Sequence, residues 1–209
     1  MVKIDQAGVP ERETARRARP MPPDERRAAI ISATLPLLRR YGDDVSTRQI
    51  AEAAGVAEGT IFRAFTDKDS LIRAALDAAF DPTSTVELID AINPARPLDD
   101  RVTDAVRILQ TRMASVSELM MAMRLHIPPD DANGLRRKAL ARTEMLHRAL
   151  ARMLQPDRDA LRVPVADVAR TLRLLVFAGS HPVVTDGRPL TTKQIVSVLL
   201  DGVRKREAS

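Results

Sequence analysis

The fold of this chain is decided by residues 55–71, which read Gly55-Val56-Ala57-Glu58-Gly59-Thr60-Ile61-Phe62-Arg63-Ala64-Phe65-Thr66-Asp67-Lys68-Asp69-Ser70-Leu71. One short helix is predicted before this stretch, over 47–54, and a second within it, over 58–64. Gly55 lies between them and supplies a turn conformation that costs other residues more. Two short helices joined in this way are typical of a helix-turn-helix, whose second helix enters the major groove of DNA.

Small and apolar side chains around this turn fit the same geometry. Ala51 is small where the two helices would cross, and the wedge that would fix their angle is formed by Ile50, Val56 and Ile61. The spacing of Ala51, Gly55 and Ile61 is that of a DNA-reading unit, and an ordinary helical hairpin inside a bundle is the alternative.

Helical periodicity continues through the rest of the chain, and no strand-like alternation occurs, so we predict an all-α fold. The first helix starts near Asp24, continues through Pro36 with a kink, and ends at Gly42. Capping boxes begin two helices, at Ser46 with Gln49 and at Thr191 with Gln194. The other helices are predicted over 69–80, 98–125, 131–154, 164–180 and 191–206, with a short piece over 86–92.

Three parts follow from this pattern. Residues 1–22 are polar and are predicted to form a flexible basic arm, residues 23–68 a three-helix helix-turn-helix DNA-binding domain, and residues 69–209 a helical body.

Composition narrows the class of protein. The net charge is +5 and the sequence pI about 10.2, which favours polyanionic partners. Aromatic residues make up only 2%, too few for readers that stack bases. The chain has no cysteine and no long apolar run, so disulfides, thiolate metal sites and membrane spans are not expected, and we expect a cytoplasmic protein.

The stretch quoted above resembles the signature of the tetracycline-repressor (TetR) family. That pattern has Gly-Val, Gly-Thr, an aliphatic residue, two aromatic residues three apart, then Lys and Leu. Arg40-Tyr41-Gly42 and Thr47-Arg48-Gln49-Ile50-Ala51 match it too, so the resemblance covers about residues 24–76.

The resemblance implies roles for several side chains. Thr47 and Lys68 would contact phosphates, Thr60 and Arg63 would face the groove, and Gly59 would let the backbone approach DNA. Arg48 and Glu58 would lie at the edge of the groove. The family often has Tyr where Phe62 stands and His where Ala64 stands, so two backbone contacts differ here. A basic arm would compensate by entering the minor groove or following phosphates, through Arg16, Arg17 and Arg19; a solvated tail is the alternative.

Candidate catalytic or metal-binding groups are scattered. No two of the three histidines, His126, His147 and His181, stand at metal-ligand spacing. The acidic pairs Asp99-Asp100 and Asp130-Asp131 precede helices and fit as caps. We therefore expect no enzyme, no metal and no cofactor.

Methionines cluster in the C-terminal part and suit an adaptable apolar surface. The resemblance implies that residues 69–209 form an effector-binding and dimerisation domain, in which these methionines would line a cavity for a small lipophilic effector. Plain core packing is the alternative. The predicted pocket residues are Leu109, Met113, Met120, Met123, Arg124, His126, Leu150 and Phe177.

The last two long helices carry apolar sets that would pair with a second copy as a four-helix interface, and the small Ala178 and Gly179 would let the helices approach. The predicted interface residues are Leu172, Leu175, Val176, Ile195, Val198, Leu199 and Val203.

The function predicted is a sequence-specific transcriptional regulator: a homodimer on a pseudo-palindromic DNA operator, and a repressor released by its effector. The alternative is a helical ligand-binding or interaction protein that has lost specific DNA reading.

Overall fold

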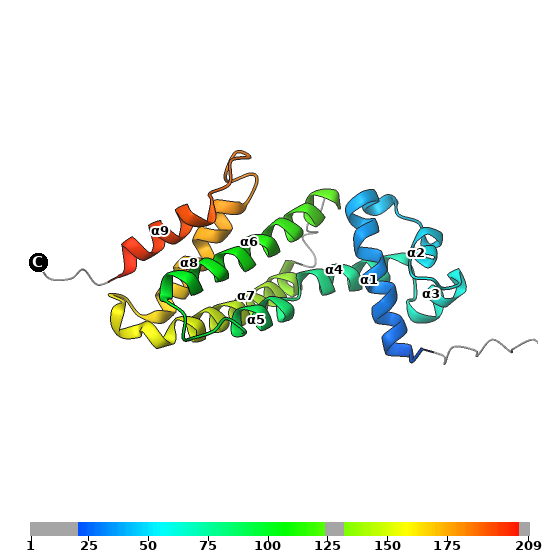
Figure 1. The fold of residues 1–209 in the computed structure, drawn as a ribbon. Coiled ribbons are helices and arrows are strands. Elements are labelled where there is room, and N and C mark those ends of the chain that lie inside the picture. The colour runs from blue at the N-terminus through cyan, green and yellow to red at the C-terminus, as the bar shows by residue number, and fades with distance from the viewer. Residues whose placement is uncertain (1–20, 124–131, 205–209) are drawn as a thin grey trace, which may run out of the picture.

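The computed structural model describes residues 21–123 and 132–204, which fold as a string of helices (Figure 1). Within these ranges, β pairing is limited to an isolated antiparallel bridge between Leu161 and Arg204. The predicted all-α fold is confirmed. Residues 1–20 of the predicted basic arm lie outside the described residues.

Three helices form the N-terminal unit: α1 (Pro23–Tyr41), α2 (Thr47–Ala53) and α3 (Glu58–Ala64). α1 continues through Pro36 and ends where Gly42 takes a positive φ of 57° and starts a short 3-10 turn, Gly42–Asp44. The predicted capping box at the start of α2 is present, because the Ser46 side chain accepts from the Gln49 amide and the Gln49 side chain accepts from the Ser46 amide.

α4 (Lys68–Phe80) follows, with a further capping box made by Asp67 and Ser70. The hydrogen bond from the Ser70 amide holds the pKa of the exposed Asp67 carboxyl below its ordinary value. The first half of α4 completes the core of the N-terminal unit. This core consists mainly of Ile30, Leu38, Val45, Ile50, Ala51, Ile61, Phe65, Leu71, Ile72, Ala75 and Leu119. A division of the chain at residue 68 stays a prediction.

The C-terminal body contains α5 (Thr83–Asp90), α6 (Leu98–Ala122), α7 (Ala132–Leu154), α8 (Val165–Ser180) and α9 (Thr192–Val203). A 3-10 segment, Gln155–Ala160, joins α7 to the turn before α8. α8 packs against α6, α7 and α9, and α5 packs against α6 and α7. The predicted short helix over 86–92 is α5, which begins three residues earlier. The capping box predicted at Thr191 is present.

The two units meet at α1, α4 and the end of α6 (Figure 1). Leu119 of α6 is fully buried in the N-terminal core, and Met123 packs against the same core. A Cβ placed on Gly42 would lie 2.6 Å from the carbonyl oxygen of Ala122, so the turn after α1 touches the end of α6. Arg39 and Glu118 form an ion pair at 3.6 Å across this junction.

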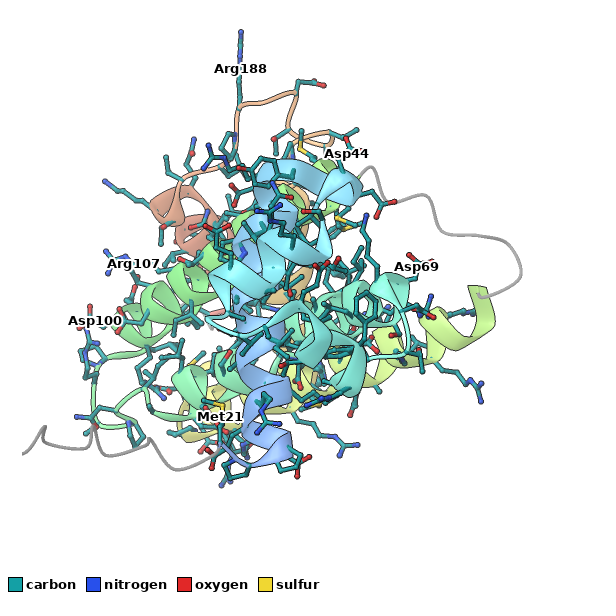
Figure 2. All side chains as sticks on the ribbon, turned by 90° about the vertical axis from the view of Figure 1, so that its right-hand side faces the viewer. Met21, Asp44, Asp69, Asp100, Arg107 and Arg188 are labelled. Atoms are coloured by element: carbon teal, nitrogen blue, oxygen red, sulfur yellow. The ribbon has the colours of Figure 1, made fainter. Side chains whose placement is uncertain are left out.

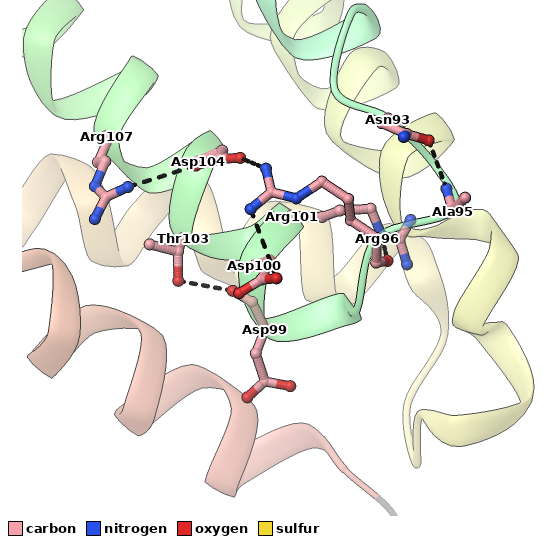
Figure 3. A network of polar contacts seen from close by, with 9 residues as sticks. All are labelled: Asn93, Ala95, Arg96, Asp99, Asp100, Arg101, Thr103, Asp104 and Arg107. Carbon is pink, nitrogen blue, oxygen red and sulfur yellow. Dashed lines mark hydrogen bonds and ion pairs between the residues drawn. The ribbon is translucent and has the colours of Figure 1, made fainter.

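Charged side chains gather at the start of α6 (Figure 3). Arg96 pairs with Asp100 and Asp104, and Arg107 pairs with Asp104 at 3.5 Å. Asp99 and Asp100 lie in the first turn of α6, but Pro97 occupies the cap position. These acids therefore act in ion pairs and on the helix dipole.

Arg101 is the exception in this cluster, because its side chain is only 1% exposed. Its guanidinium donates to the carbonyls of Met153 at 2.6 Å and Arg96 at 3.0 Å, and it pairs with Asp157. Burial lowers the pKa of Arg101. One side chain thus ties the start of α6 to the end of α7.

Replacing Asp157 by Ala leaves Arg101 buried without its carboxylate. We expect the free energy of unfolding to fall by about 2 kcal/mol, less than for a fully buried pair because Asp157 is partly exposed. Urea denaturation at fixed protein concentration measures this. Asp159→Ala is the matched control, since Asp159 is 91% exposed, and should change stability by less than about 0.5 kcal/mol. Equal losses in the two variants would contradict the assignment.

Candidate functional site

The helix-turn-helix is formed by α2 and α3. Gly55 takes a φ of 64°, as its predicted turn role requires, and its amide donates to the carbonyl of Glu52 at 3.2 Å. Ala51 is buried, and Ile50 and Ile61 are fully buried in the same core. Val56 is half-buried against the same core. The local geometry predicted from this spacing is confirmed.

α3 presents an open face at the end of the molecule. Gly59, Phe62 and Arg63 are exposed on it, with Phe62 at 53%, and nothing lies within 4 Å of a Cβ placed on Gly59. Thr60 is half-buried beside them, and Arg48 of α2 is exposed. Figure 2 looks onto this end of the molecule. The structure thus brings the predicted groove-facing residues onto one accessible surface.

Hydrogen bonds hold the residues around this surface in place. The Thr47 hydroxyl donates to Glu58 Oε1 at 2.5 Å and so ties α2 to α3. Lys68 Nζ donates to the carbonyl of Asp43 at 2.5 Å. Both predicted phosphate contacts therefore have intramolecular partners in the free protein.

A further brace was missed by reasoning from the sequence. Arg27 of α1 donates to the carbonyl of Ala64 at 2.5 Å, at the end of α3, and stacks 4.0 Å from the centre of the Phe65 ring. In the sequence, Arg27 is visible only as a basic residue within the first two turns of α1. Nothing in the pattern there reveals its contacts with Ala64 and Phe65.

A cavity of about 550 Å³ lies in the body, lined from α4, α6, α7 and α8. Four of the predicted pocket residues line it: Leu109, Met113, Met120 and Phe177. Leu150 instead lies in the body core, and Met123 packs against the N-terminal core. Arg124 and His126 lie outside the described residues.

The polar lining of this cavity was not predicted. It consists of Thr143 and four arginines, Arg112, Arg136, Arg142 and Arg173. Arg112 donates to the carbonyls of Phe80 at 2.6 Å and Asp81 at 3.0 Å. Burial lowers the pKa of Arg112 and the charge of Arg142 lowers it further, while Asp81 acts in the opposite direction.

Arg142 shares the carboxylate of Asp77 with Lys138, at 3.1 Å and 2.7 Å. Burial alone would raise the pKa of Asp77, but the hydrogen bonds and charges of these two cations outweigh it and hold the pKa below its ordinary value. This cluster fixes α7 to α4.

The predicted interface residues on α8 and α9 face the body itself. Leu172, Val176, Ile195, Leu199 and Val203 are buried within the protomer, and Leu175 packs against the same core. Gly179 is small because Leu190 packs on it, 3.0 Å from a Cβ placed there. These side chains hold α8 and α9 in place; among the seven predicted, Val198 is exposed, at 60%.

The described ranges contain no group of three His, Asp or Glu side chains arranged to hold a metal ion. His181 packs against Phe177, with ring centres 5.4 Å apart. None of the described helices combines the length and apolar character needed to cross a bilayer.

Known proteins with similar features are regulators. Residues 30–75 match the family described as bacterial regulatory proteins, tetR family. No curated protein matches the chain.

Solved structures share the fold. A TetR-family transcriptional regulator from Mesorhizobium loti has a TM-score of 0.62 and 17% identity, over 89% of this chain and 100% of that one. A TetR-family protein from Vibrio parahaemolyticus has a TM-score of 0.58 and 18% identity, over 87% and 100%. NalD of Pseudomonas aeruginosa, the secondary repressor of the MexAB-OprM multidrug efflux pump, has a TM-score of 0.52 and 21% identity, over 87% and 97%.

Three observations point to the same kind of protein. They are the helix-turn-helix at one end, the match of its residues to the family model, and the fold shared along the body. Residues 30–75 thus match the tetR family of bacterial regulatory proteins, and the described helices share the fold of solved TetR-family regulators.

Proposed function

We propose that this protein is a sequence-specific DNA-binding transcriptional regulator that places α3 in the major groove. The observation that carries the proposal is the open face of α3, where Gly59, Phe62 and Arg63 are exposed. The helix is held by Arg27 of α1 at its end and by the bond between Thr47 of α2 and Glu58 at its start. A rigid, accessible helix at one end of the molecule is what groove reading requires.

The side chains on and around this face have different roles in the proposed DNA recognition. Arg63 reads a guanine through paired donors, with Thr60 beside it and Arg48 at the edge of the groove. Gly59 allows close approach of the backbone, and Phe62 makes an apolar contact. Thr47 and Lys68 exchange their present partners, Glu58 and the Asp43 carbonyl, for phosphate oxygens. The arm residues Arg16, Arg17 and Arg19 add contacts outside this groove.

A homodimer is required, because one short helix reads few bases and two copies read a pseudo-palindrome. The side chains that α8 and α9 leave exposed include Leu174, Ala178 and Val198. We propose these as interface residues, in place of the buried set predicted from the sequence.

We further propose a repressor released by a small effector in the body cavity; repression is the activity named for the Pseudomonas aeruginosa relative. α6 offers a physical route. Met113, Val116 and Met120 line the cavity, while Leu119 and Met123 pack on the N-terminal core. A ligand that shifts α6 therefore shifts the reading helix. The protein has no catalytic role in this scheme and acts in the cytoplasm, where the operator lies.

The second candidate is a helical interaction protein that no longer reads DNA. The observation in its favour is that Phe62 and Ala64 lack the polar atoms that the resembled pattern often has at these positions.

Selection of bound duplexes from a random pool, at about physiological salt, separates the two candidates. We expect an inverted repeat. Arg63→Ala should weaken binding to the selected duplex by about 1–3 kcal/mol and relax the base preference at one position of each half. Arg188→Ala removes the same charge from a side chain that projects from the distant α8–α9 loop, and should leave binding unchanged (Figure 2).

Recovery of no sequence motif would favour the second candidate. A salt titration then completes the comparison: a reader with six to ten phosphate contacts loses about 10³–10⁵ in affinity between 50 and 200 mM salt. A flat dependence would contradict DNA binding of any kind.

Two glycine substitutions test the reading unit with opposite signs. Gly55→Ala forces a side chain into a positive φ and should lower the free energy of unfolding by about 1 kcal/mol. Gly59→Ala adds a methyl group to a helix in open space, so it should raise stability by about 0.5 kcal/mol yet weaken operator binding. Thermal unfolding and duplex titration measure both effects. Unchanged operator affinity in Gly59→Ala would contradict close backbone approach.

Val198→Arg places a charge on the proposed dimer face. We expect a monomer by analytical ultracentrifugation, with operator affinity reduced because two half-sites are no longer read together. Leu88→Arg on α5 is the matched control, since Leu88 is 57% exposed and Val198 is 60% exposed. A Val198→Arg dimer of wild-type strength would place the interface elsewhere.

A further inference from the structure

The cavity in the body has an unusual balance of side chains for a lipophilic site. Its lining comprises nine apolar residues, one threonine, four arginines and no acid. Pockets for small molecules are mostly apolar, with a few polar groups that set orientation. Four cations without an acid among the lining residues therefore indicate the sign of the ligand charge.

Two of these arginines are already partly neutralised or engaged. Arg142 shares Asp77 with Lys138, and Arg112 donates to two backbone carbonyls, which carry no net charge. Arg142 also lowers the pKa of Arg112, so the two positive charges repel each other within the cavity wall. A negative group near them would relieve this repulsion.

Arg173 supplies the strongest indication. Its Nε is buried and has no hydrogen-bond partner among the described residues. Burial lowers the pKa of Arg173, and the charge of Arg170 lowers it further. A desolvated guanidinium donor without an acceptor is costly, and a carboxylate oxygen is its best complement.

Two further polar groups of this kind lie at the end of α8. Ser180 Oγ and His181 Nδ1 are also buried without hydrogen-bond partners among the described residues, and they follow Arg173 and Phe177 at helical spacing. Of Arg173, Ser180 and His181, only Arg173 lines the cavity, so a ligand lying along α8 would meet Arg173 on one side and Met113, Val116 and Met120 on the other.

We propose that the effector is an amphipathic organic anion: an acidic head held by Arg173, with an apolar chain among the methionines of α6. This inference rests on the proposed function in assigning the cavity to an effector, and it replaces a generally lipophilic ligand by one with a defined charge.

Three probes with the same ten-carbon chain test the charge: decanoate, decanol and decyltrimethylammonium, each below its micelle concentration. Calorimetric titration of the full chain without DNA gives the affinities. We expect decanoate to bind at least about tenfold more tightly than decanol, and the cation not to bind. Equal binding of decanol and decanoate would overturn the proposal, and this comparison needs no variant.

Arg173→Gln locates the head group. We expect a ten- to hundredfold loss of decanoate affinity with decanol affinity unchanged. Arg170→Gln is the matched control, because Arg170 is an exposed cation on the same helix that does not line the cavity; its loss should stay below about threefold. Equal losses in both variants would mean that decanoate follows the overall positive charge, and would overturn the assignment.

Operator titration with and without decanoate separates this inference from the proposed function. Decanoate binding that leaves operator affinity unchanged would support the anion site and contradict release by an effector. Operator binding by a protein that shows no preference for the anion would overturn the anion site and leave the DNA-reading function standing.

Discussion

The position of the N-terminal unit relative to the body depends on contacts at the end of α4, and Arg112 makes the most direct of them. Arg112 of α6 donates two hydrogen bonds, to the carbonyls of Phe80 and Asp81, where α4 finishes. These carbonyls belong to a helix end whose last acceptors have no intrahelical donor. A cation placed there satisfies the acceptors and interacts favourably with the helix dipole. Because the first half of α4 lies in the N-terminal core, Arg112 fixes the N-terminal unit relative to the body.

A second set of contacts acts on the same helix. Asp77 of α4 pairs with Lys138 and Arg142 of α7. Together with Arg112 of α6, these residues make both α6 and α7 bind the final turn of α4. The end of α6 adds Leu119 in the N-terminal core and the close approach of Gly42 to Ala122. The helices that line the cavity therefore also hold the N-terminal unit in position. A rearrangement within the walls changes the position of α4 because packed interiors shift as units.

Local signals predicted most of the fold. The capping boxes at Ser46 and Thr191 and the turn at Gly55 depend on residues within a few positions of one another, and the structure confirms all three. The cavity lining was predicted only in part, because Arg112, Arg142 and Arg173 come from three different helices. Periodicity reveals the apolar face of each helix but not which faces meet, so convergence of the arginines has no signal in the sequence.

For the buried residues of α8 and α9 too, the sequence pattern does not reveal the packing partner. Leu172, Ile195 and Leu199 repeat at helical spacing, which fits packing on a second copy as well as packing on the body. Only the tertiary arrangement distinguishes the two, and it assigns these side chains to the protomer core. An interface must then use what this packing leaves exposed.

A ligand shifts a conformational equilibrium only through groups that it contacts differently in the two states. Leu109 and Val176 lie within the body core, so contact with them adds affinity but little difference between states. Arg112 is different, because it lines the cavity and also holds the end of α4. With the proposed anion bound, the acidic head held by Arg173 would also attract the Arg112 guanidinium, compete with the Phe80 and Asp81 carbonyls for it and weaken its hold on α4. Under the proposed mechanism, the charge of the ligand therefore provides the coupling to DNA, while its apolar chain provides most of the binding.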